Sequence, residues 1–178
     1  MEELANKITL RPKYFLRKCR IMPNARRQKD IKADRILVIL AGLRETIMDE
    51  LTDSYRAVGI LDLSPPHGAV LCALKTDKAC TMLEIAEKIF RDQSTVTGLV
   101  GRLRQLGYVK VMSGEVDRRQ RMVLLTQEGR ILRSQVTRVA RRIQSRIFRN
   151  ISAPDRKNLM NTLAKIGFNL HNTHYAQR

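Results

Sequence analysis

No segment of this 178-residue chain is hydrophobic enough to cross a membrane. The longest apolar run, Ile36 to Leu43, falls well short of the roughly 18 consecutive apolar residues that a spanning helix needs. The N-terminus starts with acidic Glu2 and Glu3 and contains no apolar core of a signal peptide. We therefore expect the protein to stay in the cytoplasm and not to insert into a membrane.

Acidic residues are also scarce. The chain has 17 Asp and Glu residues against 34 Lys and Arg residues, which gives a net charge of +17. Positions 1–35 hold eleven basic and four acidic residues, so the positive excess continues through the rest of the chain. This excess indicates a polyanionic partner, either nucleic acid or an anionic membrane surface, because the phosphates of both attract Lys and Arg.

Residues that carry metal or catalytic chemistry are few and scattered. Cys19, Cys72 and Cys80 show no C-x-x-C spacing, which predicts free thiols and no zinc site. His171 and His174 have helical spacing but no acidic or cysteine partner nearby. No Ser/His/Asp, Cys/His or paired-carboxylate arrangement stands out. The sequence therefore predicts no metal, no cofactor and no catalytic residues, and a protein that is not an enzyme.

Most of the chain shows helical periodicity. After a basic extension at 1–33 that lacks a clear period, apolar residues recur at steps of three and four from Asp34 to Val58, which predicts one long amphipathic helix. Ser64-Pro65 has the residue types that begin a helix. A second long apolar pattern runs from Gln127 to Ile151, and Ser152 to Asp155 separates it from a last helix.

Two short helices lie between these long ones. Thr81 and Glu84 form a capping box, which predicts a helix from Met82 to about Phe90. Asp92 is the expected N-cap of a second helix, and Gly107 is placed to end it. Two short helices joined by three or four residues form a helix-turn-helix.

The period then changes to that of strands. Tyr108 to Met112 and Arg121 to Leu125 predict two strands joined by a turn at Gly114 to Asp117. A hairpin after a helix-turn-helix is a wing. The predicted fold is therefore mostly α with a small β-hairpin wing, a winged helix-turn-helix flanked by long helices at both ends.

The second short helix has the features of a helix that enters the DNA major groove. Opposite its apolar stripe it presents small or polar side chains that can contact bases or phosphates, while its glycines let the backbone approach closely. These candidate DNA-binding residues are Ser94, Thr95, Thr97, Gly98, Arg102 and Gln105. A solvated helix face is the alternative for such a pattern, and the adjacent short helix and hairpin favour the DNA-binding interpretation.

The turn of the hairpin provides the remaining candidates, Asp117, Arg118, Arg119 and Arg121. Alternation along a hairpin can place Asp117 and Arg119 on one face, so that the carboxylate holds the guanidinium in one rotamer. A pre-ordered arginine suits the narrow and strongly negative minor groove. An ordinary turn with solvated charges is the alternative.

The segment from Asp117 to Gly129 resembles the wing and following strand of the MarR (multiple antibiotic resistance regulator) family, and Ser94 to Val100 resembles its recognition helix. The order of elements also matches from about Asp34 to His171. The resemblance implies a homodimer, held by its first and last helices, that binds a pseudo-palindromic operator in duplex DNA. It also implies that a wing arginine enters each minor groove; by position Arg119 matches that arginine and Asp117 its partner.

The sequence departs from the family pattern at two glycines. Many relatives carry arginine at the position of Gly98 and an acidic residue at that of Gly101, so fewer major-groove contacts are expected here. Arg102 or the basic N-terminal extension is a candidate for compensating contacts. Some relatives sense oxidants through a cysteine of the first helix, and Cys19, among basic neighbours that favour its thiolate, is the best candidate for such a role.

These features together predict four regions: a basic N-terminal extension at 1–33, a dimerisation helix at 34–63, a DNA-binding lobe at 64–126 and C-terminal dimerisation helices at 127–178. The predicted function is that of a sequence-specific transcriptional regulator, a repressor, and the family resemblance implies a pocket for a small-molecule effector that releases it from its operator. A non-specific architectural DNA-binding protein and a thiol-based redox-sensing regulator are the alternatives. The sequence does not identify the operator, the target genes or the effector.

Overall fold

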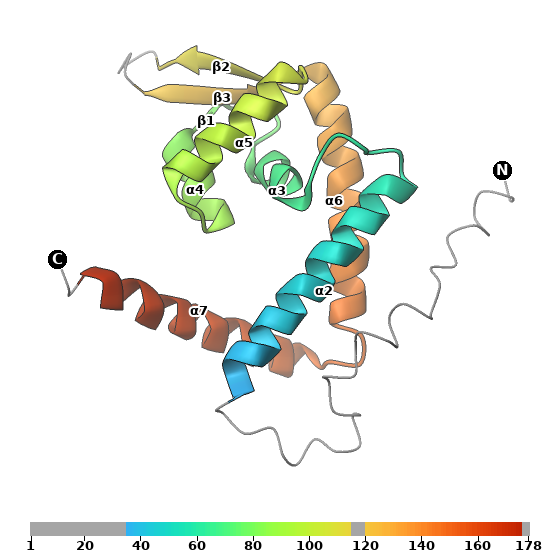
Figure 1. Ribbon diagram of the computed structural model, residues 1–178, viewed down its shortest axis with the longest axis vertical. Helices are drawn as coiled ribbons and strands as arrows, with labels where there is room; N and C mark the ends of the chain where they lie inside the picture. The colour runs from blue at the N-terminus through green and yellow to red at the C-terminus, as the bar shows by residue number, and fades with distance from the viewer. Residues whose placement is uncertain (1–34, 115–119, 176–178) are drawn as a thin grey trace, which may run out of the picture. The chain divides into compact units, whose positions relative to one another are not determined.

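The computed structural model describes residues 35–114 and 120–175, with side chains described as far as Leu170. The chain divides into two compact units, the first ending at Ala140 and the second beginning at Arg141. Figure 1 shows the elements along the chain, coloured from blue to red. The predicted fold class is confirmed, because the described residues are mostly helical with one small antiparallel sheet.

The first unit begins with two helices whose ends match the sequence signals. Helix α2 spans Ile36–Ala57, and Gly59 follows it with a φ of 81°. Helix α3 spans Pro65–Ala73, and Ser64 precedes it in an extended conformation, as an N-cap does. Proline at the first helical position fits there because its missing N–H would have no partner within the helix.

The core of the first unit lies where three helices meet. Helices α4, Met82–Ile89, and α5, Gln93–Gln105, pack against each other and against α3. The side chains at their contact are fully or almost fully buried; they include Val70, Leu71, Leu74, Ile85, Val96, Val100 and Leu103. This packing fixes one side of α5 and leaves its opposite side exposed.

The sheet has three strands in the order β1-β3-β2. Strands β2, Val109–Ser113, and β3, Arg121–Leu125, pair antiparallel with Val111 opposite Val123. Strand β1, Cys80–Thr81, pairs with the middle of β3 and was absent from the sequence prediction. Two residues are too few to show a strand period, so only the pairing with β3 defines this strand.

Helix α6, Gln127–Ile147, begins in the first unit, directly behind the hairpin. Thr126 caps its first turn by accepting a hydrogen bond from the Gly129 amide at 3.0 Å. A Cβ at position 129 would lie 1.9 Å from the Tyr108 carbonyl oxygen, so only glycine allows this close backbone approach. The apolar stripe of α6 is buried at Leu132 and Val136.

The second unit contains the end of α6 and helix α7, Ala153–Tyr175. Helix α6 ends at Ile147, four residues before the last apolar position of the predicted pattern, and Asn150 adopts a φ of 60° in the turn that follows. Asn tolerates this left-handed conformation better than most residues. Ser152 begins α7 as predicted, because its hydroxyl oxygen accepts from the Asp155 amide at 3.3 Å.

None of the helices among the described residues is both long and apolar enough to cross a membrane.

Candidate nucleic-acid interface

The N-terminus of α5 is held by a dense set of hydrogen bonds to one carboxylate. Asp92 accepts from the Thr95 amide at 2.7 Å and from the hydroxyls of Thr95 and Ser94. These donors, Ser94 first, hold the pKa of the Asp92 carboxyl well below its usual range. Asp92 is the predicted N-cap, and its bonds fix the first turn of the helix.

The C-terminus of α5 is held equally firmly. The Tyr108 amide donates to the Leu103 carbonyl and the Gly107 amide to the Arg104 carbonyl, both at 3.0 Å. This Schellman motif requires a left-handed residue, and Gly107 supplies it with a φ of 78°. The Thr126 hydroxyl then donates to the Gly107 carbonyl at 2.8 Å, which ties the end of α5 to the start of α6.

All six candidate residues of α5 lie on its exposed side. The hydroxyls of Ser94 and Thr95 are engaged by Asp92, and that of Thr97 donates to the Gln93 carbonyl at 2.8 Å. Arg102 and Gln105 are exposed as well, and so is Arg104, which was not among the predicted residues.

The two glycines of α5 are not required by packing. A Cβ added at Gly98 or Gly101 would meet no atom within 4 Å. Glycine in the middle of a helix costs about 0.5–1 kcal/mol relative to alanine. No packing contact in the fold compensates for this loss of stability. Glycines of this kind are expected where a ligand approaches the backbone closely.

His67 of α3 lies close to this surface, near enough for the charge of Arg102 to act on it. Its Nδ1 accepts a hydrogen bond from the Ser64 amide at 3.3 Å and lies 2.8 Å from the Ser64 hydroxyl oxygen. Partial burial, and then the positive charge of Arg102, lower the pKa of His67. His67 thus caps α3 in its neutral form beside the charged side of α5.

The wing is described only in part. Arg121 is exposed at the start of β3, opposite Ser113 of β2, and the Gly114 amide donates to the Gln120 carbonyl at 2.8 Å. Asp117, Arg118 and Arg119 lie outside the described residues. Their ion pair and their position at the wing tip remain predictions.

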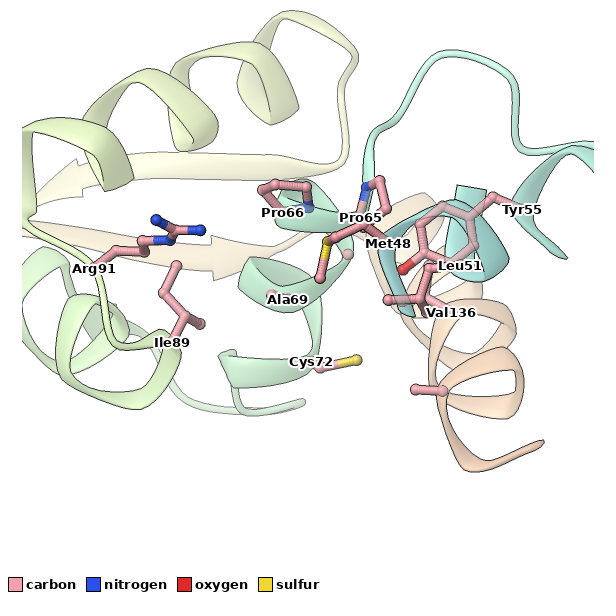
Figure 2. Close-up of a pocket in the computed structure, with 12 residues that line it drawn as sticks. Met48, Leu51, Tyr55, Pro65, Pro66, Ala69, Cys72, Ile89, Arg91 and Val136 are labelled. Atoms are coloured by element: carbon pink, nitrogen blue, oxygen red, sulfur yellow. The ribbon is translucent and has the colours of Figure 1, made fainter. Parts of the chain in front are cut away.

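A pocket of about 300 Å³ lies in the first unit, beside the turn between α4 and α5. Figure 2 shows Ile89 and Arg91 on one side of it and Tyr55 and Leu51 on the other, with α3 between them. Most of its lining is apolar, and Arg91 is the one charged side chain among the described residues that line it. Since Arg91 precedes Asp92, the pocket wall continues directly into the N-cap of α5.

Tyr55 is the most buried polar side chain of the pocket, with 2% of its surface exposed. Burial, and to a lesser extent Cys72, raise the pKa of its hydroxyl. This hydroxyl lies against Gly68 of α3. A Cβ at position 68 would lie 1.9 Å from the hydroxyl oxygen, so Gly68 makes room for it.

The cysteines differ in their surroundings. Cys72 is half-buried, lines the pocket and has its Sγ 3.6 Å from the Thr137 hydroxyl oxygen. Cys80 is buried in β1, and Cys19 lies outside the described residues. Within 35–114 and 120–170, no group of His, Cys, Asp and Glu side chains has an arrangement that would hold a metal ion.

Comparison with known proteins finds a family match in the middle of the chain. Residues 61–120 match the model of the MarR family. The transcriptional regulator SarZ of Staphylococcus aureus (strain USA300) is 26% identical over 102 residues, which cover 57% of this chain and 68% of SarZ.

Two solved structures extend the similarity along the chain. BpsR of Bordetella bronchiseptica, whose DNA binding is regulated by 6-hydroxynicotinic acid, is 25% identical with a TM-score of 0.61, and the match covers 78% of this chain and 97% of BpsR. FabT of Streptococcus pneumoniae, solved in complex with DNA, is 18% identical with a TM-score of 0.64 over 80% of this chain and 99% of FabT. The second of these likenesses concerns the fold alone.

Proposed function

We propose that this chain, whose residues 61–120 match the MarR family of DNA-binding transcription regulators, binds a pseudo-palindromic operator as a homodimer and represses transcription. The observation that carries the proposal is the geometry of α5, which is fixed at both ends and exposes a polar side. A helix that reads base edges needs this rigidity, because a side chain must be held at a fixed position to form hydrogen bonds with the right base and not with the wrong one.

Each candidate residue then has a role in the proposal. Arg102 and Gln105 contact bases, while Thr97 and the N-terminal turn with Ser94 and Thr95 lie along phosphates. Gly98 allows the helix backbone to approach the groove. In the wing, Arg119, oriented by Asp117, enters the minor groove, and Arg118 and Arg121 contact phosphates.

Exposed apolar side chains support the homodimer. In the first half of α2, Leu37 is 77% exposed and Val38 is 54% exposed. In α7, Phe168 is 66% exposed and Leu170 is 65% exposed. Apolar helix faces of this kind are typical of protein interfaces. Sedimentation equilibrium should give the mass of a dimer, and a monomer at micromolar concentration would contradict this part of the proposal.

The pocket supports regulation by a small-molecule effector. Its volume lies at the lower end of the range for small-ligand sites, its walls are apolar, and Arg91 offers a single positive charge. We infer an effector about the size of one ring that carries a carboxylate. Occupancy at Arg91 would shift Asp92 and with it the orientation of α5.

The effector proposal can be tested with benzoate and its neutral analogue benzamide. Benzoate should weaken operator binding by the wild type and have little effect on Arg91→Gln, whereas benzamide should act on neither. Equal effects of benzoate on both proteins would remove Arg91 from the effector site.

The operator proposal is tested by selecting bound fragments from genomic DNA and footprinting them. We expect inverted repeats whose half-sites lie about one helical turn apart, which is the spacing that a two-fold symmetric dimer requires. A non-specific architectural protein is the second candidate, because the net charge of +17 favours it. Protection without a preferred sequence would support that candidate.

A further inference from the structure

The two units differ in charge. Between residues 141 and 175 the second unit has seven basic residues and a single acidic one, Asp155. The described part of the first unit, which contains α5, has fourteen basic and ten acidic residues. The highest density of unbalanced positive charge among the described residues therefore lies outside the winged helix-turn-helix.

One of these basic residues has a local structural role. Arg156 donates to the Ile151 carbonyl at 2.8 Å and to the Phe148 carbonyl at 3.0 Å, and its guanidinium lies 5.3 Å from the centre of the Phe148 ring. These contacts hold the turn between α6 and α7. The charge of Arg156 thus stabilises the carbonyl end of α6 and needs no external partner.

Arg141, Arg142 and Arg149 have no such role. All three are exposed, and none of the residues in the described part of the chain forms an ion pair or hydrogen bond with their guanidinium groups. Arg149 lies in the turn that follows α6; the Phe148 amide still donates to the Gln144 carbonyl as in a helix, and the Arg149 amide donates to the Arg146 carbonyl, so Arg149 stays about two helical turns beyond Arg142. By helical geometry Arg142 and Arg149 lie nearly one above the other, and Arg141 lies about 100° further round, on the side opposite buried Ile143.

The residue type is informative as well. Every basic residue between 127 and 150 is arginine, and none is lysine. A solvated helix face gains as much from lysine as from arginine, whereas the planar guanidinium forms paired hydrogen bonds with phosphate oxygens. The composition favours a surface that binds phosphate over one that merely keeps the protein in solution.

We propose that Arg141, Arg142 and Arg149 form a second DNA-binding surface, which we call the α6 arginine stripe, that contacts the phosphates of duplex DNA without reading its sequence. The stripe is about 12 Å long, and duplex DNA presents one phosphate per 3.4 Å of axis on each strand, so three guanidiniums can each meet a phosphate. Membrane lipid is the less suitable phosphate source, because most of the apolar stripe of α6 is buried, and the two exposed isoleucines, Ile131 and Ile147, lie far apart along the helix and form no continuous face to insert.

The experiment measures how DNA affinity changes with salt concentration, using the full chain and a duplex of arbitrary sequence. For the triple variant Arg141→Gln, Arg142→Gln and Arg149→Gln, the slope of log K against log salt should become shallower by about 0.9 for each lost contact, or about 3 per protomer. The charge-preserving variant with lysine at the three positions should keep most of the slope.

A matched control removes the same amount of charge elsewhere. Arg44, Lys75 and Lys78 are exposed residues of the first unit outside α5 and the sheet, and their triple glutamine variant has the same net charge as the stripe variant. Its slope should stay within one unit of the wild type. Equal slopes for the two triple variants would overturn the proposal, because the effect would then reflect net charge alone.

Two further measurements separate this proposal from the operator proposal and from a membrane role. The stripe variant should keep the wild-type preference for operator over scrambled duplex, so a lost preference would contradict a sequence-independent surface. If the operator proposal fails, the stripe variant should still show a shallower slope than the wild type on arbitrary duplex. Binding to phosphatidylserine vesicles that falls in the stripe variant, with an unchanged DNA slope, would assign the stripe to membrane lipid instead.

Discussion

The two units of this chain show two different ways of using charge. In the described part of the first unit ten acidic residues offset most of the fourteen basic ones, and Asp92, Gly107 and Thr126 fix the position of α5. In the second unit the basic residues are mostly exposed and have almost no acidic counterparts. Positioned groups can discriminate between base sequences, whereas concentrated charge strengthens binding to any sequence. The difference suggests that specificity and general affinity reside in different units.

Removal of the wing arginine is the strongest test of this division between specificity and general affinity. Arg119→Ala should weaken operator binding by about 10- to 100-fold, because the glycine at position 98 leaves fewer contacts in the major groove to compensate. Affinity for scrambled duplex should fall far less. A quantitative gel-shift titration measures both, and near-wild-type operator affinity would contradict the assignment of Arg119.

The close contact of Tyr55 and Gly68 supports the pocket, and its loss should be the largest stability effect. Gly68→Ala should destabilise the fold by about 1–3 kcal/mol, because the new methyl group would overlap the Tyr55 hydroxyl. Gly98→Ala is the matched control and should stabilise the fold by up to about 1 kcal/mol, since its methyl group enters open space. Urea denaturation compares the two, and equal effects would contradict the packing described here.

Arg102 offers a finer test of base reading. Arg102→Ala should change the preference at one base pair of each half-site by about 1–3 kcal/mol, as expected for loss of a base contact. Arg104→Ala, also exposed on α5, should lower affinity without changing the preference. Titrations against a set of single-base operator variants distinguish these results; an unchanged preference would remove Arg102 from the base-reading residues.

The smallest expected effect concerns pH. Because the folded state lowers the pKa of His67, it favours the neutral imidazole, and its contribution to stability is complete above the ordinary pKa of about 6.5. This contribution decreases as the pH falls below 6.5, and it is lost once the pH is below the lowered pKa of His67 in the folded state. His67→Gln should remove this part of the pH dependence, a change below about 0.5 kcal/mol for a group so near the surface. Urea midpoints at pH 5 and 7.5 measure it.

Local signals predicted the framework of the interface well. The cap at Asp92, the capping box at Thr81 and the helix end at Gly107 depend on residues within a few positions of each other, and all three are present in the structure. Strand β1 was missed because it is defined by pairing with β3, more than 40 residues away.

The sequence did not predict the residues of the pocket, because they too come together from distant parts of the chain. The fit between Tyr55 and Gly68 joins two helices, and no periodic pattern marks it. The family resemblance implied an effector site, but no pattern in the sequence pointed to Arg91, the charged residue of the proposed site. The role of His67 as a cap was likewise hidden, because histidine is not among the usual capping residues.

The most direct test of the account is the ratio of operator to scrambled-duplex affinity, measured for the wild type by competition between about 50 and 300 mM salt. Both affinities should fall as salt rises, because phosphate contacts contribute to both. The ratio should stay at about 1,000 or more, as it does for proteins that read base sequence. A ratio near one at every salt concentration would contradict the central claim that α5 and the wing read an operator.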